Sequence, residues 1–187
     1  MNITIRPAVA TDARVWEEIH AAGWEYAYRG IFDDEYLDGA KKKFIDNIPK
    51  TAEWLAGLDP KTTAPLVAVN DAGQIVGTLF GHIKTADDGT KTFVLQGLYN
   101  DPKFIGGGVG KKLMLAFAEW AAARGGKKFI VGCLEKNKSR GFYEYMGGVA
   151  VKSAPFRDQV EIFFEYDIPT LLKRGEIKRP YTPDLTR

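Results

Sequence analysis

Two repeating patterns of hydrophobic and polar residues run along this chain, and each predicts one kind of element. Alternation at every second residue indicates strands, because successive side chains on a strand point to opposite faces. Recurrence at every third or fourth residue indicates helices, because such residues share one helical face. The chain shows strand-like segments at residues 2–6, 66–69, 75–83, 91–99, 129–134, 149–151 and 160–168. These segments predict a sheet of about seven strands.

Four other segments show helical spacing. The first ends near Gly30, and a second helical region, over residues 44–58, is broken near Pro49. A third covers residues 113–124 and stops at a pair of glycines, which commonly end helices. A short fourth helix is expected at residues 139–146.

The order of these elements predicts the fold class. Strands 66–69, 75–83 and 91–99 follow one another through short turns rich in Asn, Asp and Gly, which is typical of an antiparallel meander. The strand, helix and strand over residues 91–134 predict a parallel pair joined by a right-handed crossover. The expected fold is therefore α/β (α+β), with a mixed, mostly antiparallel central sheet of about seven strands and helices on both faces.

Length and composition are those of one globular domain. The chain has 187 residues, which is enough for a substantial core, and 45% of them are hydrophobic and 27% charged. We expect a single domain over residues 1–168 and a basic, proline-containing tail at 169–187. The tail could wrap the domain, join a partner or be mobile.

Charge and hydropathy predict where the protein works. The formal net charge is +2, which indicates no large surface for nucleic acid. No apolar run approaches the ~20 residues that span a membrane, and residues 1–7 lack the pattern of a signal peptide. We therefore expect a cytoplasmic protein that binds neither nucleic acid nor membranes. A homodimer is left open.

Metal ligands and reactive thiols are scarce. The one cysteine, Cys133, lies in an apolar run and is interpreted as a core residue rather than a nucleophile. The two histidines, His20 and His82, do not suggest a histidine-rich site. The sequence therefore predicts no internal disulfide and no metal site.

A glycine-rich loop is the most informative stretch. Four of the five residues at 106–110 are glycine, and the loop connects a strand ending at Tyr99 to a helix. Glycine lets the backbone approach a ligand closely, and free N–H groups at a helix N-terminus favour an anion. Lys111 and Lys112 add positive charge there. The loop therefore predicts a ligand that carries phosphate.

Two familiar phosphate-binding loops do not fit these residues. A Walker A loop would need glycine at Ile105 and Ser or Thr at Lys112. A dinucleotide-binding fingerprint starting at Gly106 would need glycine at Lys111. A nucleotide-phosphate-binding enzyme therefore remains a hypothesis supported by the glycine loop alone.

The loop resembles that of the GNAT superfamily of acyl-CoA-dependent N-acetyltransferases, whose members carry Gln/Arg-x-x-Gly-x-Gly/Ala there. Gly108 and Gly110 match the two small positions, whereas Ile105 replaces the Gln or Arg. The replacement removes a side-chain donor but leaves the backbone amides, so we expect weaker or differently arranged phosphate contacts. The resemblance implies that acetyl-CoA is contacted by Leu98, Tyr99, Asn100, Ile105, Gly106, Gly107, Gly108, Val109, Gly110, Lys111, Asn137 and Arg140.

A second motif at residues 137–148 strengthens this resemblance. Members of the superfamily often carry Asn, a short gap, Phe-Tyr-Glu and then Gly-Gly or Gly-Phe in this place. Asn137 matches the residue that bonds the pantetheine arm or orders water, and Tyr143 matches the general acid that protonates the departing thiolate. Taken without the rest of the motif, Tyr143 could equally be a buried packing residue.

The first helix resembles the segment that lies over the acceptor site in this superfamily. Trp24, Glu25 and Tyr28 are therefore candidates for contacting the acceptor, and His82 is a further candidate at the end of a strand. Each of these aromatic residues could instead pack the core, and His82 could be a surface or a satisfied core residue.

The general base is not identified by the sequence. Many superfamily members place Glu or Asp on the strand before the loop, but residues 93–99 contain no acid, and Gln96 is the only polar side chain before Tyr99. Glu25 and His82 are weak candidates for this role, acting through water.

The resemblance implies an acetyl-CoA-dependent N-acetyltransferase, which moves an acetyl group directly to the amine of a small molecule or peptide. Backbone N–H groups near residues 98–100 would polarise the thioester carbonyl. The alternative is a catalytically silent acyl-CoA-binding sensor or interaction module of the same fold. The acceptor's identity and the acyl-chain preference are not defined by the sequence.

Overall fold

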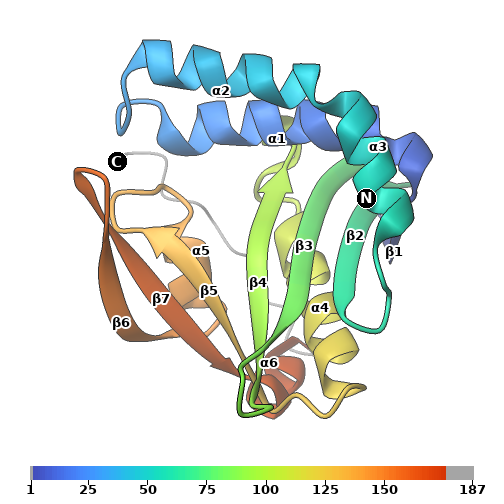
Figure 1. The fold of residues 1–187 in the computed structure, drawn as a ribbon, viewed down its shortest axis with the longest axis vertical. Helices are drawn as coiled ribbons and strands as arrows, with labels where there is room; N and C mark the ends of the chain where they lie inside the picture. The colour runs from blue at the N-terminus through green and yellow to red at the C-terminus, as the bar shows by residue number, and fades with distance from the viewer. Residues whose placement is uncertain (1, 176–187) are drawn as a thin grey trace.

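The structure is a computed structural model that describes residues 2–175, and its centre is one seven-stranded sheet (Figure 1). The strands lie in the order β1-β2-β3-β4-β5-β7-β6. Their bounds are β1 Ile3–Pro7, β2 Thr63–Asn70, β3 Ile75–Thr85, β4 Lys91–Asn100, β5 Lys128–Leu134, β6 Val149–Phe156 and β7 Gln159–Asp167. The helices are α1 Ala13–Tyr28, α2 Asp34–Asp46, α3 Ile48–Gly57, α4 Val109–Ala122, α5 Arg140–Tyr145 and α6 Ile168–Gly175.

The predicted mixed sheet is confirmed, and its one parallel pair shapes the molecule. β4 and β5 pair only where Phe93–Leu95 faces Phe129–Val131, whereas the other neighbouring strands pair antiparallel. Beyond these three residue pairs, β5 leans away from β4 (Figure 1). The second half of β4 therefore has an edge that no neighbouring strand covers.

A bulge lies at the point where this edge becomes free. In the pairing of β3 with β4, Phe80 faces Gly97 while Gly81 faces Leu95, so Gln96 has no partner across the ladder. A bulge of this kind bends the strand and increases its twist. Both effects help β4 to separate from β5 after Leu95.

Helices cover both faces of the sheet, and the alternation along β2 shows why. Leu66 and Ala68 lie in a core built around α4, whereas Val67 belongs to a second core with Trp16 of α1 and Leu55 of α3. Neighbouring residues of a strand point to opposite faces, so β2 is apolar on both sides and needs cover from both.

On the α1 side, α2 begins at Asp34, before the helical region that was predicted at 44–58. The expected break near Pro49 separates α2 from α3, and Pro49 occupies the first turn of α3, where no backbone donor is required. On the other face, α4 begins at Val109, within the glycine-rich stretch 106–110.

The chain continues as α6 after β7. Ile168 and Leu171 are buried in the core around α4, so residues 169–175 of the predicted tail pack against the domain. Residues 176–187 lie outside the described part of the chain, so the roles predicted for that part of the tail remain predictions. Between residues 2 and 175, none of the helices has the length and apolar character that a membrane crossing requires.

Close contact between α1 and β4 depends on Gly23, which yields a test of packing. A Cβ at Gly23 would lie 2.8 Å from Cδ1 of Tyr99, a ring that cannot move easily. Gly23→Ala should therefore lower the free energy of unfolding by about 1–3 kcal/mol in urea denaturation.

Gly39 of α2 is the matched control for this substitution. It is exposed, and a Cβ there would meet no heavy atom within 4 Å. Gly39→Ala should therefore stabilise the protein by about 0.4–1 kcal/mol, because alanine favours the helix and restricts the unfolded chain. Equal effects of the two variants would contradict this account of the α1–β4 contact.

Candidate active site

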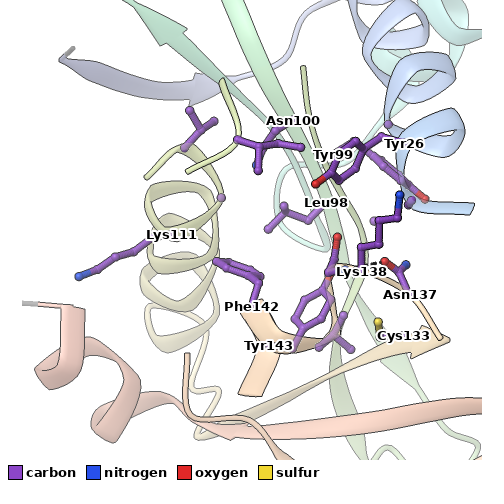
Figure 2. A pocket seen from close by; sticks show the side chains of 18 of the residues that line it. Tyr26, Leu98, Tyr99, Asn100, Lys111, Cys133, Asn137, Lys138, Phe142 and Tyr143 are labelled. Carbon is purple, nitrogen blue, oxygen red and sulfur yellow. Dashed lines mark hydrogen bonds between the residues drawn. The ribbon is translucent and has the colours of Figure 1, made fainter. Parts of the chain in front are cut away.

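A cavity of ≈ 410 Å³ opens where β4 and β5 separate. Its walls come from α1, the second half of β4, the glycine loop, the end of β5 and the start of α5 (Figure 2). Most of the residues predicted for the site lie here together. They are Tyr28, Leu98, Tyr99, Asn100, Ile105, Gly106, Gly107, Gly108, Val109, Gly110, Lys111, Asn137 and Tyr143.

The glycine loop forms one end of the cavity. Gly106 and Gly108 have φ values of +83° and +79°, in the left-handed region that side chains disfavour. Gly108 is the N-cap of α4, so the first amides of this 14-residue helix have no acceptor within the helix. In the described residues, no acceptor bonds the N–H of Gly108, Val109 or Gly110.

These features fit a phosphate-bearing ligand. The N-terminus of α4 carries positive dipole charge and presents backbone donors toward the cavity. A Cβ at Gly110 would lie 3.2 Å from Nδ2 of Asn100 and 3.3 Å from Cζ of Phe142, so glycine lets α4 begin close against β4 and α5. Lys111 projects from the same turn, away from Tyr143 (Figure 2).

Asn137 connects β5 to α5. Its side chain is 9% exposed, and its Oδ1 accepts a 2.7 Å hydrogen bond from the backbone N–H of Ser139. This bond holds the turn that leads into α5. The amide Nδ2 makes no hydrogen bond to another described residue, so it is available to a ligand in the cavity.

Tyr143 lies on α5 beneath the cavity. It is 7% exposed, packs between Phe142 and Phe164, and points its hydroxyl into the cavity toward the end of β4 (Figure 2). Its backbone carbonyl accepts a 2.7 Å hydrogen bond from the hydroxyl of Tyr166. Burial raises the pKa of Tyr143 well above its usual value of 10, so the hydroxyl keeps its proton at neutral pH.

A second group of aromatic residues closes the cavity on the α1 side. The indole N–H of Trp24 donates a 3.0 Å hydrogen bond to the hydroxyl of Tyr99, and Tyr28 also interacts with that hydroxyl. Burial raises the pKa of both Tyr28 and Tyr99. Both tyrosines are therefore neutral at physiological pH.

Cys133 lies in the wall of the cavity. It is buried, and burial raises the pKa of its thiol to about 12. A thiol is a nucleophile only as the thiolate, so Cys133 is not suited to covalent catalysis at neutral pH. Among residues 2–175, no group of three or more His, Cys, Asp or Glu side chains is placed to hold a metal ion.

Four of the predicted site residues do not line this cavity. Glu25 pairs with Arg29 at the surface, and Arg140 is held by Glu144, with an Nε–Oε1 distance of 2.9 Å. His82 lies along β3, where its ring stacks on Phe80. Trp24 lines a separate hollow between α1 and α2, and it contacts the site through Tyr99 and Tyr28.

The structure adds lining residues that the sequence did not single out. Tyr26 and Lys138 meet across the cavity mouth, with the ammonium 5.4 Å from the ring centroid. Both residues lie in segments that the sequence analysis had already selected: Tyr26 in the first helix and Lys138 in the motif at residues 137–148. Gly132 and Glu161 could not be assigned to the site from the sequence, because only the placement of β7 beside β5 brings them together.

Three solved structures share the fold of this chain. PaiA N-acetyltransferase from Thermoplasma acidophilum, in complex with coenzyme A, has a TM-score of 0.68 and 20% identity over 89% of this chain and 100% of its own. A GCN5-related N-acetyltransferase from Rhodopseudomonas palustris has a TM-score of 0.68 and 23% identity over 89% and 96%. YncA from Salmonella typhimurium, with its cofactor acetyl-CoA, has a TM-score of 0.60 and 18% identity over 99% of both chains.

The sequence comparisons add the family. No curated protein sequence matches this chain. The acetyltransferase (GNAT) family matches residues 17–147, a segment that includes the glycine loop, Asn137 and Tyr143. The chain therefore belongs to the acetyltransferase (GNAT) family.

Proposed function

We propose that this protein transfers an acetyl group from acetyl-CoA to the amine of a small molecule or peptide. One observation carries the proposal: a single cavity joins the glycine loop, at the start of α4, to the buried hydroxyl of Tyr143. Phosphate-binding amides and a proton donor are thus combined in one space. The presence of CoA or acetyl-CoA in two of the structures that share the fold supports the same donor here.

The residues of the chain divide between holding the donor and polarising it. The amides of Gly108, Val109 and Gly110 would hold phosphate oxygens, and Nδ2 of Asn137 would bond the pantetheine arm. The uncovered edge of β4 beyond Leu95 presents backbone N–H groups to the cavity. Such fixed donors stabilise the negative charge that develops on an acyl oxygen.

Tyr143 would serve the leaving group. When bound, acetyl-CoA supplies a reactive thioester, and its sulfur leaves as a thiolate. The neutral Tyr143 hydroxyl can donate a hydrogen bond to that developing charge. Burial makes complete proton transfer from the tyrosine less favourable than it would be for an exposed phenol, so donation of the hydrogen bond is its main contribution.

Calorimetry with acetyl-CoA and a thiol-release assay test the proposed function together. We expect saturable binding of acetyl-CoA, and release of free thiol with at least one acceptor from a panel of spermidine, tyramine, lysine and a peptide with a free α-amino group. Binding without turnover on any amine would favour an acyl-CoA sensor of the same fold. Folded protein that binds no acetyl-CoA would contradict the proposal itself.

A further inference from the structure

We propose that Glu161 binds the cationic acceptor amine and takes its proton before acetyl transfer. The inference rests on the proposed function and supplies the general base that β4 lacks. It assigns this role to a residue of β7, a strand that carries neither of the two sequence motifs.

The placement of Glu161 is the first support. Glu161 pairs across the sheet with Leu134 at the end of β5, and it lines the cavity together with Tyr143. Among the described residues that line the cavity, it is the only carboxylic acid; the other charged ones are Lys111 and Lys138. An ammonium ion that enters this space has one anionic partner.

The absence of a side chain at Gly132 is the second support. A Cβ on Gly132 would lie 2.2 Å from Oε1 of Glu161, so the carboxylate occupies the space where a β5 side chain would stand. Glycine at this position thus lets a residue of β7 reach across β5 into the cavity. A larger residue would push the carboxylate away.

The surroundings of the carboxylate favour a base. Within residues 2–175, no donor is hydrogen-bonded to it, so its oxygens can receive a proton or an ammonium group. Burial raises the pKa of Glu161, and Lys152 on β6 opposes that rise. Burial is also the main cause of the raised pKa of Cys133 on β5 and Tyr28 on α1, and the Glu161 carboxylate adds to both, so these groups face it.

The other acids near the site are already engaged. Glu17 of α1 is buried but hydrogen-bonded to Thr51, on the side of α1 that faces α3. Glu25 pairs with Arg29, and Glu144 with Arg140. Among the described residues, Glu161 is thus the carboxylate that both lines the cavity and has no hydrogen-bond donor.

The Glu161 carboxylate accepts one proton from the ammonium group, and the neutral nitrogen forms a bond to the acetyl carbon of acetyl-CoA. The carbon–sulfur bond of the thioester breaks, and the thiolate leaves with a hydrogen bond from Tyr143. The second amine proton passes to solvent, and the thiolate takes up one proton from solvent. Glu161 then releases the proton that it accepted, so the carboxylate is regenerated and one proton is released overall.

Glu161→Gln tests the assignment, with Glu165→Gln as the matched control. Glu165 lies on the same strand and pairs with Lys128 at 2.6 Å, outside the cavity. We measure acetyl-CoA binding by calorimetry and thiol release with the four amines of the panel. Glu161→Gln should bind acetyl-CoA like the wild type and lose about 100-fold in kcat/KM for the amine, whereas Glu165→Gln should retain both.

The pH profile separates a base from a structural residue. A base must be deprotonated, so the wild-type rate should fall as pH falls through the raised pKa of Glu161. In Glu161→Gln the fall in rate caused by protonation of Glu161 should be absent. The rate should then rise with pH only up to the pKa of the amine. Glu161→Asp keeps the charge but shortens the side chain. Its rate should lie between those of the wild type and Glu161→Gln, and it should still fall at acidic pH.

Two results would overturn the assignment. One is turnover by folded Glu161→Gln equal to that of the wild type, with the same pH profile. The other is absence of turnover with every amine by both proteins. In the second case, retained acetyl-CoA binding would leave the donor site of the proposed function standing, whereas its loss would refute that function too.

Discussion

Gly108→Val should lower the affinity for acetyl-CoA by at least about 100-fold while leaving the protein folded. Gly108 has a φ of +79° at the start of α4, and a β-branched residue resists this conformation. The loop must then either hold valine in a strained state or rotate its amides away from the cavity. Each charge-assisted hydrogen bond to phosphate that is lost costs about 1.5–3 kcal/mol, and two such losses account for the expected change.

Gly89→Val is the control for backbone strain alone. Gly89 has a φ of +83° in the exposed turn between β3 and β4, and a Cβ there would meet no heavy atom within 4 Å. Both variants should lose about 1–2 kcal/mol of stability, but only Gly108→Val should lose acetyl-CoA affinity in calorimetry. Wild-type affinity in Gly108→Val would show that the loop does not hold the donor.

Much of the fold could be predicted because its signals are local. The alternation in β1 and β7 and the glycines that end α4 act within a few residues, and each predicted element is present in the structure. The separation of β4 from β5 could not be predicted. It depends on a bulge at Gln96 and on pairing that ends at Leu95, and both are set by contacts between distant segments.

The candidate site divides in the same way. The glycine loop and the stretch from Asn137 to Tyr143 are contiguous in sequence, so a motif was enough to place them in one cavity. Glu161 could not be found in this way, because the strand order β5-β7-β6 decides which strand lies beside the cavity. Trp24, which was predicted to contact the acceptor, lines the separate hollow between α1 and α2, and its indole N–H is hydrogen-bonded to Tyr99.

The departure at Ile105 takes on a clearer physical meaning in this setting. Its side chain lines the cavity beside the glycines and cannot donate a hydrogen bond. Phosphate binding must then depend more heavily on the backbone amides at the start of α4. Any distortion of the loop backbone should therefore be costly here, which is the reason for the large effect expected of Gly108→Val.

Tyr143→Phe should reduce kcat several hundredfold and leave acetyl-CoA binding nearly unchanged. The ring would keep its packing between Phe142 and Phe164, so only the hydroxyl that points into the cavity is lost. Loss of one preorganised hydrogen-bond donor to a developing negative charge lowers kcat about 10²–10³-fold. Thiol release under saturating substrates measures the loss, and calorimetry with acetyl-CoA checks that the donor site is intact.

Tyr166→Phe removes the hydroxyl of a neighbouring buried tyrosine. This control distinguishes a loss of stability from a loss of catalysis. The Tyr166 hydroxyl donates a 2.7 Å hydrogen bond to the carbonyl of Tyr143 and does not line the cavity. Its loss should cost about 0.5–1.5 kcal/mol of stability, with a far smaller change in kcat, because one buried hydrogen bond is lost. The carbonyl of Tyr143 still accepts a 3.1 Å hydrogen bond from the backbone N–H of Gly148. If Tyr166→Phe instead lowered kcat as much as Tyr143→Phe, the role of Tyr143 would be to hold α5 in place. A large loss confined to Tyr143→Phe would assign the effect to its hydroxyl, since both variants keep an aromatic ring in the same core.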